Sequence, residues 1–409
     1  MNRVASYPDG HWSLAVDIPY SMGVMQGGLI FTSGQADLID KGEVCNPGDL
    51  SKQTAAAIKH IKSIFSDLGS DIEQLTKLTV FYVNNGSVDQ QAYKTEIAKI
   101  LDTRNMPVVA MVPLTHFFYP GTMVEIDAVG VNDKGARHYV NNSDYGPVSE
   151  GFSQALRSGE FIFLGGTTAQ AACGEIADPN DSVQQTHLAL ERIEKILGEF
   201  GADRRDLVKL NNWFVIGANA KEWSQSAQVR ADFYHEPGPV ATGMPLHSLG
   251  AEGVCISTDC WGMLAGDGSR IDKHRAWPEG HWDWPVHLPF KHGLKCRDYM
   301  FVGGQVSMDQ TAEIIDPHSL DLQTARSMQN VEKVLAEFGA DNNDILKLNT
   351  WYKGVNDPDR DGDTLHASVN IRSSYFSKPG PASTGIPLEN LCYENLLTET
   401  EVIAYRASK

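Results

Sequence analysis

The chain repeats one order of apolar and polar segments three times. A short apolar run that contains a glycine stands first, at 29–35, 161–167 and 299–305. Apolar runs of about four to eight residues bounded by turn residues are typical of buried strands. A segment with helical spacing follows each run, at 50–68, 183–200 and 322–338. This spacing predicts an amphipathic helix. Its apolar face in the second copy consists of Leu188, Leu190, Ile193, Ile196 and Leu197.

The remaining segments of each copy predict a second helix and three further strands. Residues that favour β structure predict a strand at 78–83, 210–215 and 348–352. A second helix is predicted near 87–102, 219–233 and 364–376. Two last strands end at 124–127, 256–259 and 398–401. With a β pair at its start, each copy has the predicted order ββαβαββ, an α+β layer with helices on one face of a sheet.

The spacing of the repeats divides the chain into three tandem domains. Ser33, Gly165 and Gly303 are separated by 132 and 138 residues, and Lys-Leu pairs repeat the same two offsets. We expect domains at 1–135, 136–268 and 269–409, because these boundaries fall in polar segments that contain glycine. Each sheet has a second face to bury. Three sheets turned inward would form an intramolecular pseudo-trimer with helices outside and clefts between copies.

Composition excludes several classes of function. Hydrophobic residues make up 42% of the chain, enough for a core in every copy, and the formal net charge is −18. Such an acidic chain lacks the basic surface that nucleic-acid binding needs. No apolar run approaches the roughly 18 residues of a membrane span, and the N-terminus has no apolar signal core. The six cysteines form no CxxC pair, so we expect reduced thiols in a cytoplasmic protein.

Three motifs of the first copy resemble the opening of a known family. They are Ile18–Val24, Ile30–Gln35 and Gly42–Val44. The family is the Rid family of reactive intermediate deaminases, also called YjgF-like or L-PSP endoribonuclease-like proteins. The resemblance covers nearly the whole chain, three times over. It implies a chorismate-mutase-like fold, which members assemble as homotrimers. It also implies sites between copies, where water hydrolyses small enamines or imines without a cofactor.

The resemblance assigns four site positions to each copy. Members use a Tyr, a Ser, an Arg that binds the substrate carboxylate, and a Glu that positions water. The matching residues are Tyr20, Ser33, Val109 and Glu125 in copy 1, Phe152, Gly165, Ala241 and Ser257 in copy 2, and Phe290, Gly303, Ser383 and Glu399 in copy 3. No copy has Arg at its position, which puts a 2-imino acid substrate in doubt, because an Arg fork suits a carboxylate. Copy 2 keeps none of the four residues and is the most divergent.

Glu125 and Glu399 are the candidates for general acid–base catalysis. An apolar cleft raises the pKa of a carboxyl group toward the range that is useful for proton transfer. The alternative is a solvated carboxylate on an outward-facing strand. Tyr20 is the candidate for a hydrogen bond to the substrate. Its alternative is packing over the seam between copies, which Phe152 and Phe290 would preserve at the cost of the hydroxyl.

The strand that ends in Ser33 supplies candidate binding groups. The backbone N–H beside Gly34 is a candidate donor to a ligand, since glycine permits close approach of the backbone. Gly165 and Gly303 would preserve that donor in the other two copies. The hydroxyl of Ser33 is present in copy 1 alone.

Two histidines belong to a motif that occurs in copies 1 and 3. Segments 8–12 and 278–282 each contain Gly-His-Trp and precede the next proline-aromatic pair at identical spacing. His11 and His281 are therefore candidate binding or acid–base groups. The alternative is an ordered arm that packs over the neighbouring copy.

The acidic stretch 357–363 has the aspartate spacing that begins a calcium-binding loop. Its twelfth position is Ser368 rather than Glu, and no helix pattern leads into it. We therefore predict a solvated acidic loop before a helix and no metal site.

Together these residues support a cofactor-independent hydrolase or deaminase acting on a small enamine, imine or related C–N substrate between copies. Glu125 or Glu399 would direct the attacking water. The alternative is a non-catalytic small-molecule sensor or scaffold that retains the clefts, which the absent Arg favours. Ribonuclease activity is disfavoured because basic, aromatic-lined grooves are lacking. We expect a small molecule as the partner, not nucleic acid or a membrane, and a self-contained pseudo-trimer with room for further dimerisation.

Overall fold

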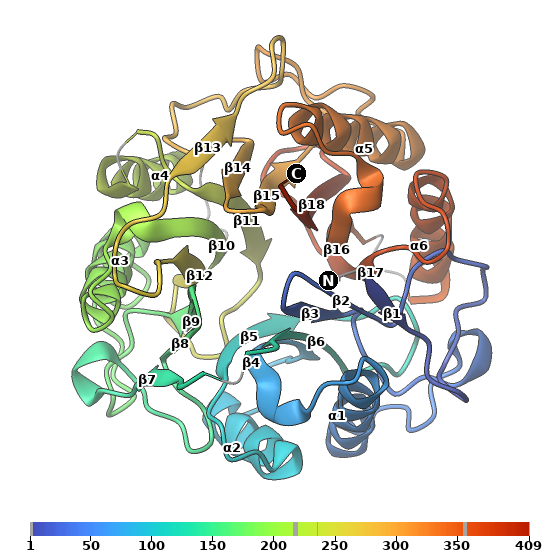
Figure 1. Ribbon diagram of the computed structural model, residues 1–409, viewed down its shortest axis with the longest axis horizontal. Coiled ribbons are helices and arrows are strands. Elements are labelled where there is room, and N and C mark those ends of the chain that lie inside the picture. The colour runs from blue at the N-terminus through green and yellow to red at the C-terminus, as the bar shows by residue number, and fades with distance from the viewer. Residues whose placement is uncertain (1–2, 134, 216–219, 235, 355–357, 409) are drawn as a thin grey trace.

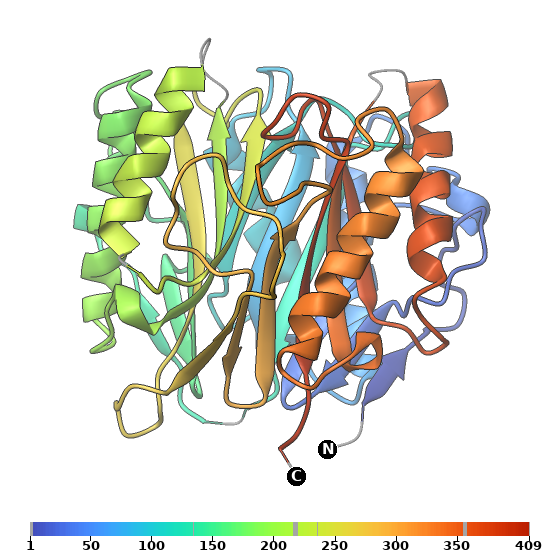
Figure 2. The same cartoon turned by 90° about the horizontal axis from the view of Figure 1, so that it is seen from above.

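Three six-stranded sheets face one another around a central axis, and pairs of helices cover their outer faces (Figure 1). The computed structural model describes residues 3–133, 135–215, 220–234, 236–354 and 358–408. Seen from the side, the sheets run along the axis, and both chain ends lie at the same end of it (Figure 2). The predicted α+β class, with inward-facing sheets and outer helices, is confirmed.

The described part of each copy follows one order of elements. Copy 1 contains β1 (Val4–Ser6), β2 (Gly23–Gln26), β3 (Leu29–Thr32), α1 (Leu50–Asp67), β4 (Leu75–Val83), α2 (Gln90–Leu101), β5 (Val108–Leu114) and β6 (Val124–Val131). Copy 2 contains β7 (His138–Val140), β8 (Ala155–Ser158), β9 (Phe161–Thr167), α3 (Ser182–Gly198), β10 (Leu207–Val215), α4 (Ala220–Tyr234), β11 (Val240–Leu246) and β12 (Ile256–Met263). Copy 3 contains β13 (Lys273–Ala276), β14 (Gly293–Cys296), β15 (Tyr299–Gln305), α5 (Leu320–Ala336), β16 (Ile345–Lys353), α6 (Pro358–Ser373), β17 (Ala382–Leu388) and β18 (Thr398–Tyr405).

All three sheets have the same strand order, which in copy 1 is β1-β2-β3-β6-β4-β5. Every pairing is antiparallel except the one between β4 and β5, which α2 joins as a crossover. Each sheet therefore has one strand more than predicted, at its β1 edge. The edge strands β1, β7 and β13 have three, three and four residues. Strands of this length are too short to show a periodic pattern.

Capping groups account for the ends of the first helix in each copy. The Asp49 side chain accepts a hydrogen bond from the backbone of Lys52 at the start of α1. Gly69 follows the helix with φ of 71°, the left-handed conformation that glycine adopts without strain. Asp181 and Ser319 cap α3 and α5 in the same way. None of the described helices is long and apolar enough to cross a membrane.

The acidic stretch of copy 3 differs from its prediction. Helix α6 begins at Pro358, ahead of the predicted position 364, so Asp359 and Asp361 lie on a helix and not in a loop. Asp357 lies outside the described residues.

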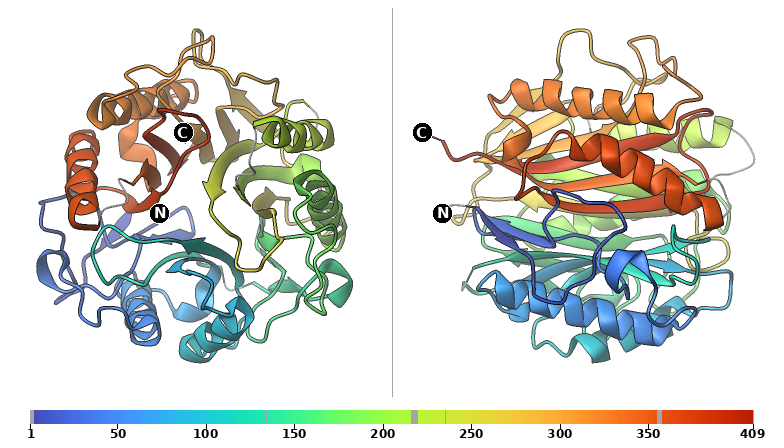
Figure 3. Two further views of the ribbon diagram at one scale, coloured as in Figure 1. Left: turned by 180° about the vertical axis from the view of Figure 1, so that it is seen from behind. Right: turned by 90° about the vertical axis from the view of Figure 1, so that its right-hand side faces the viewer.

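The inner faces of the three sheets share one apolar core. Trp261 of copy 2 lies at its centre, with ring centroids 4.7 Å from Phe163, 6.2 Å from Phe31 and 6.2 Å from Phe301. Burying one such side chain contributes about 1.5–3 kcal/mol. Helices bury the outer face of each sheet as well (Figure 3). Strands β3, β9 and β15 are therefore largely buried on both faces, which explains why the sequence has an apolar run at each of them.

A ring of buried ion pairs joins the copies around the axis. The lysine of each repeated Lys-Leu pair contacts a carboxylate on the last strand of the next copy. The pairs are Lys77 with Asp259, Lys209 with Glu401 at 2.5 Å, and Lys347 with Asp127 at 3.0 Å. Removing one partner of a buried pair leaves an uncompensated charge. The ring therefore ties every copy to both of its neighbours.

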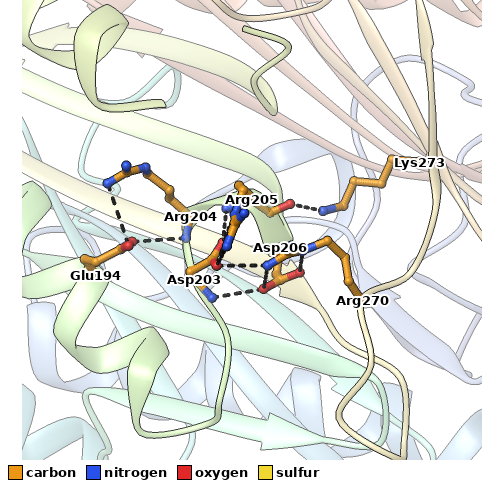
Figure 4. A network of polar contacts seen from close by, with 7 residues as sticks. All are labelled: Glu194, Asp203, Arg204, Arg205, Asp206, Arg270 and Lys273. Atoms are coloured by element: carbon orange, nitrogen blue, oxygen red, sulfur yellow. Dashed lines mark hydrogen bonds and ion pairs between the residues drawn. The ribbon is translucent and has the colours of Figure 1, made fainter. Parts of the chain in front are cut away.

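A polar network fixes the passage from copy 2 into copy 3 (Figure 4). Asp203 and Asp206 form a capping box at the turn before β10. Arg270, in the segment that enters copy 3, donates to Asp206 at 2.8 Å and to Asp203 at 2.9 Å. The Lys273 ammonium donates to the Arg205 carbonyl. These contacts anchor the connecting segment to the sheet that it leaves.

Candidate functional site

Two cavities lie at equivalent places between copies. The first cleft, between copies 1 and 3, has a volume of about 80 Å³ and is lined mainly by apolar and aromatic side chains. Tyr20, Glu125 and Arg372 are among its polar residues. The second cleft, between copies 2 and 3, has a volume of about 60 Å³ and includes Arg230 and Glu399. Both clefts therefore combine a carboxyl group with a guanidinium group inside apolar walls.

Glu125 reaches the first cleft from β6. Its carboxyl group lies directly over Gly34, where an added Cβ would come within 1.8 Å of Oε1. Burial, followed by repulsion from Asp127, raises the pKa of Glu125 to about 8, while Lys347 opposes the shift. A carboxyl group with this pKa holds its proton at neutral pH and can still release it in a reaction. Glycine at position 34 is thus needed to make room for the carboxyl group.

Glu399 has the corresponding environment in the second cleft. It reaches the cleft from β18 and lies over Gly304, where an added Cβ would come within 1.6 Å of Oε1. Burial and then repulsion from Glu401 raise the pKa of Glu399 to about 8, and Lys209 opposes the shift. The glycine under each carboxyl group comes directly before a glutamine, Gln35 or Gln305, so Gly304 corresponds to Gly34.

Tyr20 contributes to the wall of the first cleft. Burial raises the pKa of Tyr20 to about 12, against the effect of Arg372, so its hydroxyl stays protonated at neutral pH. The hydroxyl lies near Ser373, but the described residues give it no hydrogen bond of acceptable geometry. Its ring packs against Phe376, with centroids 5.8 Å apart. In the second cleft Phe290 has the equivalent position, which leaves that wall without the hydroxyl.

The hydroxyl of Ser33 forms hydrogen bonds at the seam between copies 1 and 3. It donates to the Ser21 carbonyl at 2.7 Å and accepts from the backbone N–H of Ser383 at 2.8 Å. Ser383 belongs to copy 3, so the hydroxyl joins two copies. Ser33 lines the first cleft, yet these two bonds leave it little capacity for a ligand.

Gly165 and Gly303 also lie at seams. An added Cβ on Gly165 would come within 2.8 Å of the Val109 carbonyl oxygen, and one on Gly303 within 2.8 Å of the Ala241 carbonyl oxygen. Neither glycine lines the two clefts. Their small size serves the close approach of two strands, whereas the glycines that line the two clefts are Gly34 and Gly304.

The two candidate histidines hold the arm onto its own copy. His11 and the indole of Trp12 both donate to the side-chain oxygen of Gln35, at 2.8 Å and 3.2 Å. His281 makes the same contact with Gln305 at 2.7 Å. Burial lowers the pKa of His281 to about 4, so the ring is neutral. The tryptophans line the clefts, but neither histidine does. The alternative interpretation is closer: the histidines hold the start of each arm on its own copy, and the arm then packs on the neighbour, with Ile18 against the core of copy 3 and Leu288 in that of copy 2.

The seam between copies 1 and 2 has lost the residues that line the other two. Phe152 is 2% exposed and packs in the apolar core of copy 1. Ser257 stands where the other copies have a glutamate, and an added Cβ on Gly166 would meet its hydroxyl at 2.8 Å. Ala98 stands where the other seams have arginine. At the seam of Phe152, which was predicted to bind substrate, neither the glutamate nor the arginine of the other seams is therefore present at its equivalent position.

Arg372 and Arg230 are the residues that the sequence analysis missed. Arg372 lies on α6 and is 1% exposed, and Arg230 lies on α4 and is 5% exposed. Each stands ten residues before the first residue of the next strand, β17 or β11, where copy 1 has Ala98 before β5. The clefts thus contain guanidinium groups although the expected strand position has none. The constant offset in two copies is the signal that could have identified them.

Comparison with known proteins finds the same family in every copy. The model of the family described as Endoribonuclease L-PSP matches residues 12–132, 146–254 and 285–406. A RutC family protein from Pyrococcus abyssi is 32% identical over 120 residues, which are 29% of this chain and 87% of the relative. TdcF of Escherichia coli, provisionally named a reactive intermediate deaminase, is 29% identical over 119 residues, 28% of this chain and 86% of its own.

One solved structure spans most of the chain. A chorismatase has a TM-score of 0.54 and 12% sequence identity, covering 81% of this chain and 93% of its own. At this identity the likeness shows the fold alone. The family match, in contrast, recurs once in every copy and together covers more than half of the chain. The chain therefore belongs to the Endoribonuclease L-PSP family, the Rid or YjgF-like family expected from its sequence, as three tandem copies.

Proposed function

We propose that the protein is a cofactor-independent hydrolase that deaminates a small imine or enamine in the first cleft. The observation that carries the proposal is Glu125, a carboxyl group with a pKa of about 8 held over Gly34 in an apolar cavity between copies. General acid–base catalysis is most efficient when the pKa lies near the working pH. The name of TdcF supports the reaction class.

The reaction adds one water molecule across a C=N bond, so that an imine and water give a carbonyl compound and ammonia. Protonated Glu125 first gives its proton to the imine nitrogen. The resulting carboxylate takes a proton from water as the water oxygen bonds to carbon, which forms a carbinolamine. Glu125 then protonates the amine, and the C–N bond breaks with its electron pair on ammonia. The carbonyl forms as the hydroxyl proton returns to Glu125. An enamine that is protonated at carbon gives the same iminium ion and then follows the same steps.

The surroundings of Glu125 favour these proton transfers. The walls of the first cleft are mainly apolar, so hydrogen bonds and charges inside it act more strongly than in water. Tyr20 supplies a neutral hydroxyl that can donate to the developing carbonyl oxygen. The small cavity favours a substrate with few heavy atoms.

The second cleft favours binding without turnover. Glu399 repeats the environment of Glu125, but Phe290 replaces Tyr20 and removes the hydroxyl. This one difference supports a small-molecule sensor or scaffold role for the second cleft beside a catalytic first cleft.

Freshly generated imines test the proposal. An amino acid oxidase acting on 2-aminobutanoate forms 2-iminobutanoate, and an amine oxidase acting on propylamine forms propan-1-imine, its counterpart without the carboxylate. Semicarbazide traps the remaining imine, so accelerated hydrolysis appears as slower semicarbazone formation. The proposal expects acceleration of at least one imine by the wild type, a loss of about 100-fold or more in Glu125→Gln, and retention in Glu399→Gln. Equal rates with Glu125→Gln and wild type would refute it.

A further inference from the structure

A tyrosine and a histidine meet across the seam of the first cleft, and the proposed reaction has so far used neither. Tyr119 lies on the loop between β5 and β6 of copy 1, and His366 lies on α6 of copy 3. The Tyr119 hydroxyl lies 3.1 Å from His366 Nε2, within hydrogen-bond distance. Tyr119 lines the first cleft, whereas His366 is partly exposed and does not line it. The pair therefore leads from the cavity toward the surface.

The Tyr119 hydroxyl is held near the carboxyl group of Glu125. Both residues line the same cavity. Burial, followed by the charge of Glu125, raises the pKa of Tyr119 to about 12, so the hydroxyl keeps its proton at neutral pH. Gly42 packs against the tyrosine, because a Cβ added there would come within 2.7 Å of Cζ and 2.9 Å of the hydroxyl oxygen. The described residues give no direct hydrogen bond between Tyr119 and Glu125, which leaves the space between them to a third molecule.

The proton of the Tyr119 hydroxyl belongs on the side of His366. A phenol is a better donor than a neutral imidazole N–H, and an imidazole nitrogen is a better acceptor than a phenol oxygen. The opposite arrangement would point the phenol proton into a cavity with mainly apolar walls. With the proton directed at His366 Nε2, the lone pairs of the Tyr119 oxygen can accept a hydrogen bond from inside the cavity.

The three seams of the chain provide an internal comparison. A tyrosine stands six residues before the glutamate in both clefts, and the third seam has neither residue: the pairs are Tyr119 and Glu125, Tyr393 and Glu399, and Ala251 and Ser257. Tyr393 lines the second cleft as Tyr119 lines the first. The helix position of His366 has Ser224 in copy 2 and Ala92 in copy 1. The tyrosine thus accompanies the glutamate, and a histidine faces it at the first cleft alone.

We propose that Tyr119 is a further catalytic residue of the first cleft: its oxygen accepts a hydrogen bond from the water that Glu125 deprotonates, while His366 keeps the Tyr119 proton out of the cavity. This inference rests on the proposed function. One O–H bond of the water breaks as its proton passes to the Glu125 carboxylate and the water oxygen bonds to the imine carbon. The other O–H stays hydrogen-bonded to Tyr119 and becomes the hydroxyl of the carbinolamine.

Two acceptors orient the water better than one. With both of its O–H groups engaged, the water points a lone pair at the imine carbon, which is the arrangement that attack requires. Tyr119 itself gains and loses no proton in this step. His366 acts only through Tyr119 and is therefore a positioning residue.

The test uses whichever of 2-iminobutanoate and propan-1-imine the wild type hydrolyses faster. Tyr119→Phe removes the acceptor and keeps the ring, so it should lower kcat by about 10-fold with little change in KM. His366→Leu should lose as much, whereas His366→Gln keeps an acceptor for the phenol and should retain most of kcat. The double variant of Tyr119→Phe and His366→Leu should be no slower than Tyr119→Phe, because the two residues act as one unit. His318→Leu, a change at an exposed histidine of copy 3, is the control and should behave as wild type.

A kcat of Tyr119→Phe equal to that of the wild type, or losses that multiply in the double variant, would overturn the inference and leave the proposed function standing. If the wild type hydrolyses neither imine, the proposed function fails, and the protonation of His366 then decides the inference. Nitrogen-15 NMR of labelled histidine shows which ring nitrogen carries the proton, and the signal that disappears in His366→Gln identifies the residue. A proton on Nδ1, with Nε2 accepting, supports the inference. A proton on Nε2 contradicts it, because the Tyr119 proton would then point into the cavity.

Discussion

Replacing Glu125 by Gln should make the protein more stable at high pH while removing its activity. The pKa of Glu125 is about 8 in the folded protein, against an ordinary value of 4.5. The unfolded chain therefore loses this proton near pH 4.5, and the folded protein keeps it until about pH 8. Stability consequently falls as the pH rises through this window. The Gln side chain does not ionise, so this position does not lower the stability of the variant as the pH rises.

The size of the effect follows from the two pKa values. The pKa of Glu125 rises from 4.5 to about 8 on folding, so the ionised carboxyl group destabilises the folded protein by at most about 5 kcal/mol. Between pH 6 and pH 9 the stability of Glu125→Gln relative to wild type should grow by about 3 kcal/mol. Urea unfolding at the two pH values measures this difference. Effects of the substitution that do not depend on pH cancel in the comparison.

Two controls make this result specific. Glu279→Gln, which changes an exposed carboxyl group, is the control for the loss of a surface charge. Glu399→Gln should show the same dependence as Glu125→Gln, because burial also raises the pKa of Glu399 to about 8. A stability difference between Glu125→Gln and wild type that stays constant from pH 6 to pH 9 would refute the claim that the cleft raises this pKa.

Three further substitutions test other parts of the account. Gly34→Ala should abolish imine hydrolysis with little loss of stability, because its Cβ would displace the flexible carboxyl group of Glu125; unchanged kcat would contradict this. Ser33→Ala should lower the unfolding free energy by about 1–3 kcal/mol, since a buried N–H of copy 3 loses its acceptor, whereas a pure KM effect would mean that the hydroxyl binds substrate. Lys347→Met should cost about 3–5 kcal/mol in urea unfolding by leaving Asp127 unpaired; a neutral result would show that the ring of ion pairs does not hold the copies together.

The threefold architecture could be predicted because the same order of apolar and polar segments occurs three times in the sequence. Runs such as 29–35 begin with consecutive apolar residues and continue into a glycine, and their recurrence at near-constant offsets identified both the copies and a strand in each. The need to bury the second face of each sheet then predicted the closed arrangement, and the family resemblance implied the same arrangement. The short edge strands and the early start of α6 at Pro358 could not be predicted, because neither carries a periodic apolar pattern.

The site was harder to predict than the fold because it is assembled from different copies. Glu125 could be named from its place on the last strand. Arg372 could not, since a helix residue reaches the cleft only through the packing of copy 3 against copy 1. Ser33 was predicted to bind ligand, yet its hydroxyl bonds across the seam. Sequence assigns residue types to elements, whereas the packing of two copies decides which of them meet.

A crystal structure with 2-oxobutanoate, the ketone product of the proposed reaction, tests the central claim most directly. The account predicts the ligand in the first cleft, with its carbonyl group facing Glu125. Soaking should use a concentration at which 2-oxobutanoate inhibits hydrolysis of 2-iminobutanoate in solution. An empty first cleft under those conditions, with the ligand bound elsewhere, would contradict the account.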